Sequence, residues 1–270
     1  MGEAKYNALV LAASRGNLDP LARAGGVSHK CFIDIAGRPM LSRVVEAVMA
    51  SPRVDRTIVA IEPASMEEAR SILAPLTGSD AIDYVPSAAT IGASVAAVAT
   101  EELLPLIITT GDNALHTEAM VTYFCDALDG LDGAVDGALG LTPAEAVLAK
   151  YPEGNRAFHR FRDGAFSSCN LYAILSERGL DGARVFNSGG QFGKKPRRLI
   201  GAFGLFAFLL YKSRLFTLKT VLKALSRTVG VRTAPILMPF AEGPIDVDRQ
   251  VDWDLANRIV KEREGEAARE

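Results

Sequence analysis

The sequence predicts an α/β fold with a mostly parallel, mixed central sheet and helices on both faces. Short apolar runs alternate with amphipathic segments through the first half of the chain, as in a sheet built from strand–helix–strand units. The length of 270 residues suits one large α/β domain. A composition of 49% hydrophobic and 23% charged residues is typical of a globular protein rather than a disordered one.

The predicted elements follow in chain order. The first strand is the apolar run from Tyr6 to Ala13, since a strand buried on both faces is continuously apolar rather than alternating. A Gly-Arg-Pro turn at Gly37 to Pro39 leads into an amphipathic helix at about 41–50. The later segments continue the pattern, with strands at 57–61, 82–85, 106–110, 134–141 and 171–175 and helices at 66–73, 91–100, 118–128 and 254–263. We expect one domain over residues 1–263 and a charged tail over 264–270.

The cysteines and the start of the chain favour a cytoplasmic protein. Three widely spaced cysteines show no metal-ligand pattern, so we expect free thiols in a reducing compartment. The chain runs from Met1 into a strand without a charged and then apolar leader, which argues against secretion. For His29, beside Lys30, we favour a role in the loop over a role in chemistry.

A long stretch of the second half is free of acidic residues. No Asp or Glu lies between Gly182 and Ala241, whereas eleven residues there are basic: Arg184, Lys194, Lys195, Arg197, Arg198, Lys212, Arg214, Lys219, Lys223, Arg227 and Arg232. The net charge is only −2, so the rest of the protein is acidic. A basic region of this size attracts anions such as phosphates, nucleic acid or an anionic membrane.

Within this stretch lies an apolar segment followed by a two-faced helix. The thirteen apolar residues from Leu199 to Tyr211 are too few to cross a bilayer, which needs about 20. The predicted helix after them has one basic face and one apolar face: Lys212, Lys219, Lys223 and Arg227 against Leu215, Leu218, Val221, Leu222 and Leu225, with Arg214 as a misfit. Two interpretations stay open: a helical block packed on the domain with solvated lysines, or contact of residues 199–227 with an anionic membrane.

The loop after the first strand is a candidate phosphate site. The apolar run ends in Ser14, Arg15 and Gly16, and Lys30 follows further along the chain. A strand that opens into a small-residue loop with basic side chains presents backbone N–H groups and positive charge to phosphates.

A second candidate site is formed by carboxylates. The apolar run from Leu106 ends in Gly111 and Asp112, at the edge where α/β sheets bind their ligands. Magnesium usually takes one or two carboxylates together with substrate phosphates, and Asp246 and Asp248 offer the second one. In an extended segment these two would point the same way, with Val247 on the other face. The alternative is that they form a solvated edge.

Together these segments resemble the nucleotidyltransferases of the glycosyltransferase-A-like fold, in particular the molybdopterin-cofactor guanylyltransferase-like family of NTP transferases. The resemblance rests on the following residues: Leu11-Ala12-Ala13-Ser14, Gly16, Arg23, Lys30, Gly37-Arg38-Pro39-Met40-Leu41, Gly92-Ala93-Ser94, Asp112, Asn170-Leu171 and Asp248 to Trp253. It departs from the family pattern where Ser14 replaces a glycine and where the spacer between Gly16 and Lys30 is longer than usual. The basic and apolar block at about 194–232 has no place in the family core and is therefore an insertion.

The resemblance implies a Rossmann-like fold and transfer of a nucleotidyl group from an NTP to a phosphorylated acceptor, with release of pyrophosphate. It implies that Lys30 and Arg23 neutralise phosphate charge, with Arg15 as the alternative to Arg23. Asp112 and Asp248, or Asp246 in its place, would hold Mg²⁺ or Mn²⁺. The remaining implied contacts are to the nucleotide by Ala12, Ala13, Ser14, Arg15, Gly16, Gly92 and Ser94, and to the acceptor by Asn170.

Other functions stay open beside this one. A sugar-nucleotide-dependent glycosyltransferase of the same fold generally carries an Asp-x-Asp motif, where this chain has Asp112-Asn113-Ala114. A non-catalytic, membrane-associated nucleotide-binding protein would explain the basic block. We expect an NTP and a phosphorylated sugar, polyol or cofactor as partners, no nucleic acid, and a cytoplasmic location, with peripheral attachment to the inner face of the membrane as the alternative.

Overall fold

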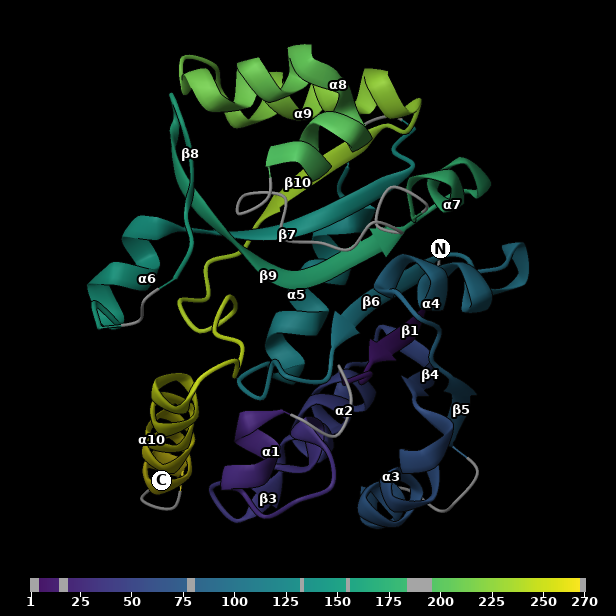
Figure 1. The fold of residues 1–270 in the computed structure, drawn as a ribbon, viewed down its shortest axis with the longest axis vertical. Coiled ribbons are helices and arrows are strands. Elements are labelled where there is room, and N and C mark those ends of the chain that lie inside the picture. Colours follow the sequence, from purple (N-terminus) through teal and green to yellow (C-terminus); the bar gives the residue numbers. More distant parts are fainter. Residues whose placement is uncertain are drawn as a thin grey trace.

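The computed structural model describes residues 5–14, 19–76, 81–131, 134–153, 156–183 and 196–267. Its centre is an eight-stranded sheet in the order β10-β7-β9-β6-β1-β4-β5, with β8 paired to β9 (Figure 1). Most neighbours are parallel, but β9 is antiparallel to β6, β7 and β8. The strands are β1 (Tyr6–Leu11), β4 (Val54–Ile61), β5 (Ile82–Pro86), β6 (Leu106–Thr110), β7 (Gly137–Pro143), β8 (His159–Phe161), β9 (Gly164–Ile174) and β10 (Thr233–Leu237). The predicted class is confirmed.

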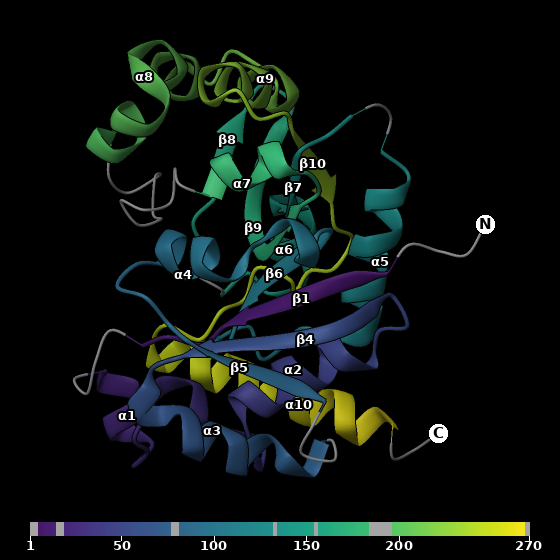
Figure 2. The ribbon, with the colours of Figure 1, turned by 90° about the vertical axis from the view of Figure 1, so that its right-hand side faces the viewer.

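Helices cover both faces of this sheet, as Figure 2 shows. They are α1 (Pro20–Ala24), α2 (Met40–Ala50), α3 (Met66–Leu73), α4 (Ile91–Val98), α5 (Glu118–Asp129), α6 (Ala144–Lys150), α7 (Glu177–Ala183), α8 (Pro196–Ser213), α9 (Leu218–Val229) and α10 (Gln250–Ala267). A short hairpin of β2 (Asp34–Ile35) and β3 (Arg38–Pro39) precedes α2.

Alternate residues of β1 show why both faces must be covered. Ala8 and Val10 pack in the cluster that contains α2, α3 and α5, whereas Leu9 and Leu11 pack in the cluster of α4 on the opposite side. All four side chains are buried. The strand therefore has no face available to water, which is the physical basis of its continuous apolar run.

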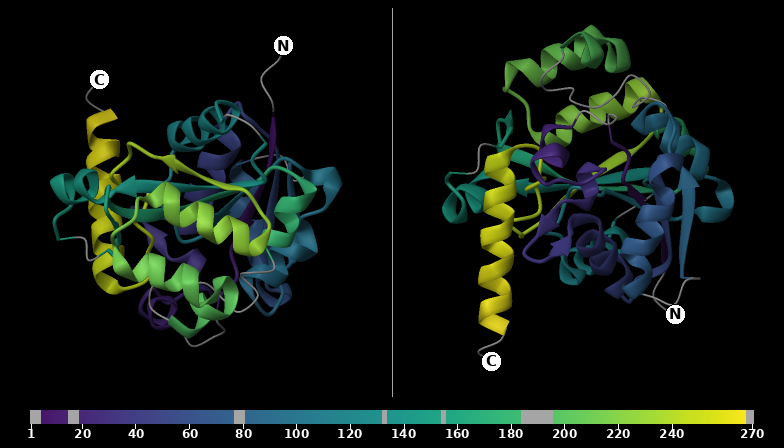
Figure 3. Two further views of the ribbon diagram at one scale, coloured as in Figure 1. Left: turned by 90° about the horizontal axis from the view of Figure 1, so that it is seen from above. Right: turned by 60° about the horizontal axis from the view of Figure 1, so that its bottom comes forward.

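The C-terminal helix α10 lies outside the sheet layers, as a long rod along one side of the molecule (Figure 3). It packs through Leu255, Ala256 and Ile259 into a separate cluster with Ile35. The indole N–H of Trp253 also donates to the backbone carbonyl of Asp34, at 2.7 Å. These contacts bring the segment before α10 back to the first third of the chain.

The acid-free block forms two helices at the β10 edge of the sheet, and this corrects one prediction. The expected single two-faced helix is divided, because Lys212 lies in α8 and Arg214 has a positive φ of 57° that separates α8 from α9. In α9 the apolar face packs inward, where Leu218 and Val221 are buried. Leu215, assigned to that face, is instead exposed in the connection. Residues 194 and 195, at the start of the predicted insertion, lie outside the described residues.

None of the helices in the described ranges combines the length and the apolar character needed to cross a membrane. The three cysteines are free and buried.

Candidate active site

The candidate site lies where β1 and β6 end side by side. Leu11 and Thr110 are register partners, so the loops that follow both strands start at the same edge. Gly111 is needed there, because a Cβ at this position would meet the Cβ of Ala12 at 3.2 Å and Cys31 Sγ at 3.0 Å. On the other side, β9 pairs with β6 only as far as Tyr172 and then diverges from it. The divergence lies at the carboxyl ends of the strands, the edge at which open α/β sheets bind ligands.

Lys30 links two of the predicted carboxylates. It begins a short 3₁₀ turn whose next two residues, Cys31 and Phe32, are buried and anchor the loop. Its Nζ donates to Asp112 Oδ2 at 2.9 Å and to Asp248 Oδ1 at 2.7 Å. Burial by itself would lower the pKa of Lys30, but the two carboxylates outweigh it and raise the pKa above its ordinary value. The ammonium is therefore held in its charged form between two acidic groups.

Asp112 is fixed at the end of β6. The hydroxyl of Thr110 lies 2.6 Å from Asp112 Oδ1 and 2.5 Å from Asn113 Oδ1, so it can donate to one of them at a time. The backbone carbonyl of Asp112 accepts a hydrogen bond from the N–H of Val247, at 3.0 Å. This bond attaches the late acidic segment to the end of the central strand.

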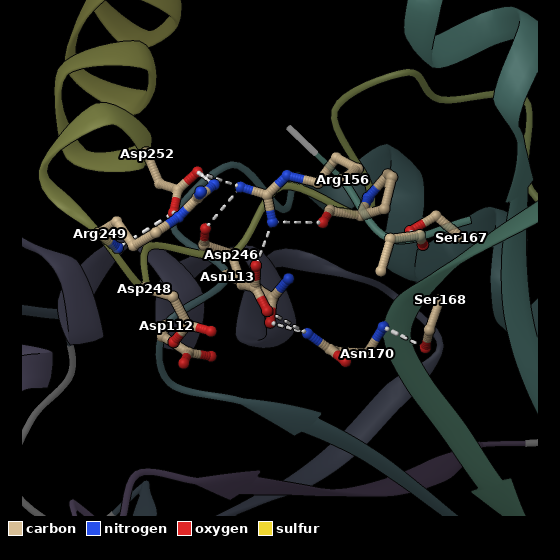
Figure 4. A network of polar contacts seen from close by, with 12 residues as sticks. Asp112, Asn113, Arg156, Ser167, Ser168, Asn170, Asp246, Asp248, Arg249 and Asp252 are labelled. Carbon is tan, nitrogen blue, oxygen red and sulfur yellow. Dashed lines mark hydrogen bonds and ion pairs between the residues drawn. The ribbon is translucent and has the colours of Figure 1, made fainter. Parts of the chain in front are cut away.

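Asp246 and Asp248 contact different cations, Arg156 and Lys30, and Figure 4 shows the contact of Asp246 with Arg156. Val247 is fully buried between them, as the extended pattern predicts. Asp248 reaches Lys30, but the carboxylate of Asp246 forms an ion pair with Arg156. Burial, then repulsion from Asp112, raises the pKa of Asp246, and Arg156 opposes this shift. The two carboxylates therefore have separate surroundings.

Arg156 is a buried guanidinium that sequence reasoning missed. Its side chain is 7% exposed and contacts Asp246 and Asp252, the latter through Nη2 at 2.7 Å from Oδ1. It also donates to the backbone carbonyls of Pro244, at 3.2 Å, and Asp246, at 3.0 Å. Asp252 in turn caps the turn into α10 by accepting from the N–H of Arg249 at 3.0 Å. Arg156 thus fixes both the backbone and a carboxylate of the acidic segment.

Asn170 lies on β9 where that strand leaves β6, with a positive φ of 52°. Asparagine is one of the few residues that adopt this conformation readily. Its Nδ2 donates to Asn113 Oδ1 at 3.0 Å, and lies 3.5 Å from Asp246 Oδ2 (Figure 4). Asn113 is fully buried, and its Nδ2 has no hydrogen-bond partner within the described part of the chain. The structure thus brings Asn170 to the acidic side chains.

The loop after β1 is held by a residue that was not predicted. Glu62, just past β4, accepts from the N–H of Ser14 at 2.5 Å and lies 3.1 Å from His29 Nε2. Because His29 Nδ1 accepts from the N–H of Cys31, the ring proton sits on Nε2 and is donated to Glu62. Burial lowers the pKa of His29 although Glu62 opposes this. His29 therefore supports the loop, which matches the role expected for it.

Other predicted residues are placed less directly. Ala12 is buried and Ala13 exposed in the loop. Arg15 and Gly16 lie outside the described residues. Arg23 is exposed on α1 and forms no ion pair within the described ranges. Ser94 is buried beside Gly92 and accepts from the N–H of Ala88 at 2.8 Å, so its hydroxyl shapes the loop before α4. A nucleotide contact of Gly92 or Ser94 stays a prediction.

The donor set suits a cation that also binds phosphate. Across the described ranges, no three His, Cys, Asp or Glu side chains form a metal cluster by themselves. Asp112 and Asp248 nevertheless both reach a single ammonium, and after burial the charges of these two carboxylates help to raise the pKa of Asp246. Mg²⁺ is commonly bound by two carboxylates together with the phosphates of its substrate, and Mn²⁺ accepts the same oxygen ligands.

The site joins Lys30 to two carboxylates at the carboxyl edge of the sheet, where open α/β sheets bind their ligands. Residues 8–178 match the family described as the MobA-like NTP transferase domain. This match covers more than half of the chain, and the protein therefore belongs to that family.

One curated relative is similar over a shorter stretch. The 2-C-methyl-D-erythritol 4-phosphate cytidylyltransferase of Rhodococcus opacus (strain B4) is 36% identical over 72 residues. The matched stretch is 27% of this chain and 30% of that enzyme. The chain thus matches less than a third of the length of this relative.

Solved structures share the fold along nearly the whole chain. A hypothetical transferase from Thermus thermophilus superposes with a TM-score of 0.73 at 23% identity, covering 92% of this chain and 99% of that one. The 4-diphosphocytidyl-2C-methyl-D-erythritol synthase of Anaerococcus prevotii gives 0.57 at 13% identity, with 96% and 97% covered. A CMP:2-keto-3-deoxy-manno-octonic acid synthetase bound to CTP gives 0.55 at 13%, with 97% and 100% covered. At these identities the likeness shows the fold alone.

Proposed function

We propose that the protein transfers a nucleotidyl group from an NTP to a phosphorylated small molecule, a sugar, polyol or cofactor phosphate, and releases pyrophosphate. The observation that carries this proposal is the position of Lys30, whose Nζ lies between Asp112 and Asp248 at the carboxyl ends of β1 and β6. The family and the cytidylyltransferase that is similar over 72 residues support the same reaction class.

In the proposed reaction, an oxygen of the acceptor phosphate attacks the α-phosphorus of the NTP. The bond from that phosphorus to the bridging oxygen breaks, and pyrophosphate leaves with its electron pair. No protein group becomes covalently bound, so catalysis consists of positioning and of neutralising charge.

Each residue of the site has a proposed part. Lys30, together with Arg23 or Arg15, stabilises the negative charge that gathers on the α-phosphate and the leaving pyrophosphate. The backbone N–H groups that follow β1 contact the triphosphate, as such loops do elsewhere. Asn170 orients the acceptor beside Asn113, to which it is hydrogen-bonded.

Asp112 and Asp248 are the residues that would hold Mg²⁺. When bound, the ion supplies positive charge to the phosphate oxygens and polarises the α-phosphorus. Asp246 is a weaker candidate than Asp248 because Arg156 already neutralises it. Without nucleotide, the ammonium of Lys30 compensates Asp112 and Asp248.

The test is pyrophosphate release with each of the four common NTPs and a panel of phosphorylated sugars and polyols. We expect turnover to require one NTP and one acceptor together with Mg²⁺, and to be lost in Asp112→Asn. Asp254→Asn, an exposed position of α10, is the matched control and should retain full turnover. Consumption of a sugar nucleotide without any NTP turnover would instead favour a glycosyltransferase, and nucleotide binding without turnover of either would favour a sensor.

A further inference from the structure

The outer side of α8 and the connection to α9 carries an exposed apolar patch, defined by Leu205, Phe206, Leu209 and Leu215. Phe206 and Leu215 are 72% and 69% exposed. With Phe216, these residues make up half of the large apolar side chains exposed in the described part of the chain, and they lie within twelve consecutive positions. Single exposed apolar residues are common on proteins, but a cluster of this kind marks an interaction surface.

The orientation of α8 keeps this patch exposed. The helical geometry of α8 breaks at Gly204, which has a φ of 78°. The part of α8 that follows Gly204 packs against the domain through two residues. Ala207 is buried, and the hydroxyl of Tyr211 lies 2.8 Å from Nδ1 of His159 on β8. Leu205 and Leu209 are one turn apart and therefore lie on the same side of the helix.

Helix α9 packs on the sheet, and α8 packs against α9. Leu218 of α9 packs with Leu141 and Phe166 of the sheet, and the carboxylate of Asp163 accepts from the N–H of Leu218 at 2.9 Å. Helices α8 and α9 lie side by side as the outermost layer at the β10 end of the molecule (Figures 1 and 2). Helices α8 and α9 are thus packed on the domain with one side and exposed to solvent on the other.

The exposed charged side chains described on α8, α9 and their connection are all basic. The same two helices and their connection carry five exposed basic residues: Lys212, Arg214, Lys219, Lys223 and Arg227. The surrounding sequence, residues 182–241, holds no Asp or Glu, and these five form no ion pair within the described ranges. An occupant of this surface should therefore offer apolar groups to the patch and negative charge to the basic residues.

We propose that this side of α8 and α9 binds the surface of an anionic membrane. The apolar patch would enter the boundary between headgroups and acyl chains, and the lysines would lie over the negative headgroups. A second copy of this chain fits less well, because a two-fold interface would set the same basic residues against each other.

The experiment is co-sedimentation of the whole protein with vesicles of phosphatidylcholine, with and without phosphatidylglycerol. We expect binding to the anionic vesicles only, weakening as salt is raised. Lys219→Glu with Lys223→Glu should lower the affinity by at least about twenty-five-fold, since each lysine near the surface contributes roughly five-fold. Phe206→Ser with Leu209→Ser should lower it by roughly tenfold or more.

A matched control removes exposed apolar side chains elsewhere. Leu148→Ser with Leu237→Ser changes residues that are 44% and 50% exposed and lie outside the patch, and it should bind vesicles like the parent. Equal binding to neutral and anionic vesicles, no binding at all, or the same loss in the control would overturn the proposal. A dimer in solution that dissociates in Phe206→Ser with Leu209→Ser would assign the patch to a second copy instead. NTP turnover of each variant, measured in parallel, keeps this result separate from the proposed reaction.

Discussion

Replacing Arg156 should destabilise the protein far more than removal of an ordinary ion pair. The guanidinium is 7% exposed and holds Asp246 and Asp252, of which Asp252 is itself only 3% exposed. Arg156→Gln leaves Asp246 without its cation, and breaking a buried pair from one side typically costs about 3–5 kcal/mol. Asp252 retains a second partner in Arg249, which argues for the lower end of that range.

The matched control is Arg258→Gln. Arg258 pairs with Glu153, and both side chains are about half exposed, so this solvated pair should contribute little to stability. Urea unfolding measures both variants, followed by the fluorescence of the only tryptophan, Trp253, which is adjacent to Asp252. A loss in Arg156→Gln as small as that in Arg258→Gln would refute the reasoning, because it would mean that Asp246 is solvated well enough without its partner.

Three further predictions concern the site and its support. Asp112→Asn and Asp248→Asn should each abolish Mg²⁺-dependent turnover with the fold intact by circular dichroism, whereas loss only in Asp246→Asn would reverse the assignment of the second ligand. Lys30→Met should lower turnover at saturating substrate by about 10²–10³-fold, and an unchanged rate would remove Lys30 from the chemistry. Burial lowers the pKa of His116 to about 4, outweighing the carbonyls of the backbone that it contacts. The folded protein therefore excludes a proton that the unfolded chain takes up below pH 6.5, and stability should fall between pH 6.5 and 4 by up to about 3 kcal/mol. In His116→Gln the free energy of unfolding should depend less steeply on pH in this window, and an identical pH dependence would contradict the assignment.

Most of the sheet could be predicted because its strands are locally apolar. Leu106–Thr110 has the predicted bounds, and the first strand is two residues shorter than expected because Ala12 and Ala13 already belong to the loop. Strand β10 was missed since Pro235 argues against a strand, and it is tolerated here because β10 is at the edge of the sheet. The division between α8 and α9 depends on the positive φ of Arg214, which no periodicity reveals.

The candidate site was predictable where a side chain directly follows an apolar strand. Asp112 is such a residue, and Lys30 was found through its place in the loop that follows the first strand. Arg156 and Glu62 were harder to recognise as site residues from the sequence. The contact of Arg156 with Asp246 joins residues 90 positions apart, and Arg156 sits in no motif. Glu62 could have been found by the reasoning that applies to Asp112, because it directly follows β4, a strand that pairs with β1.

The most direct test of nucleotidyl transfer follows the label of the NTP. With the acceptor found by the pyrophosphate screen, the protein is given NTP labelled at either the α- or the γ-phosphorus. The proposed reaction predicts that α-label joins the acceptor and that γ-label appears only in pyrophosphate. Label from the γ-phosphorus on the acceptor, or in orthophosphate, would contradict it and point to a phosphoryl transferase or a hydrolase.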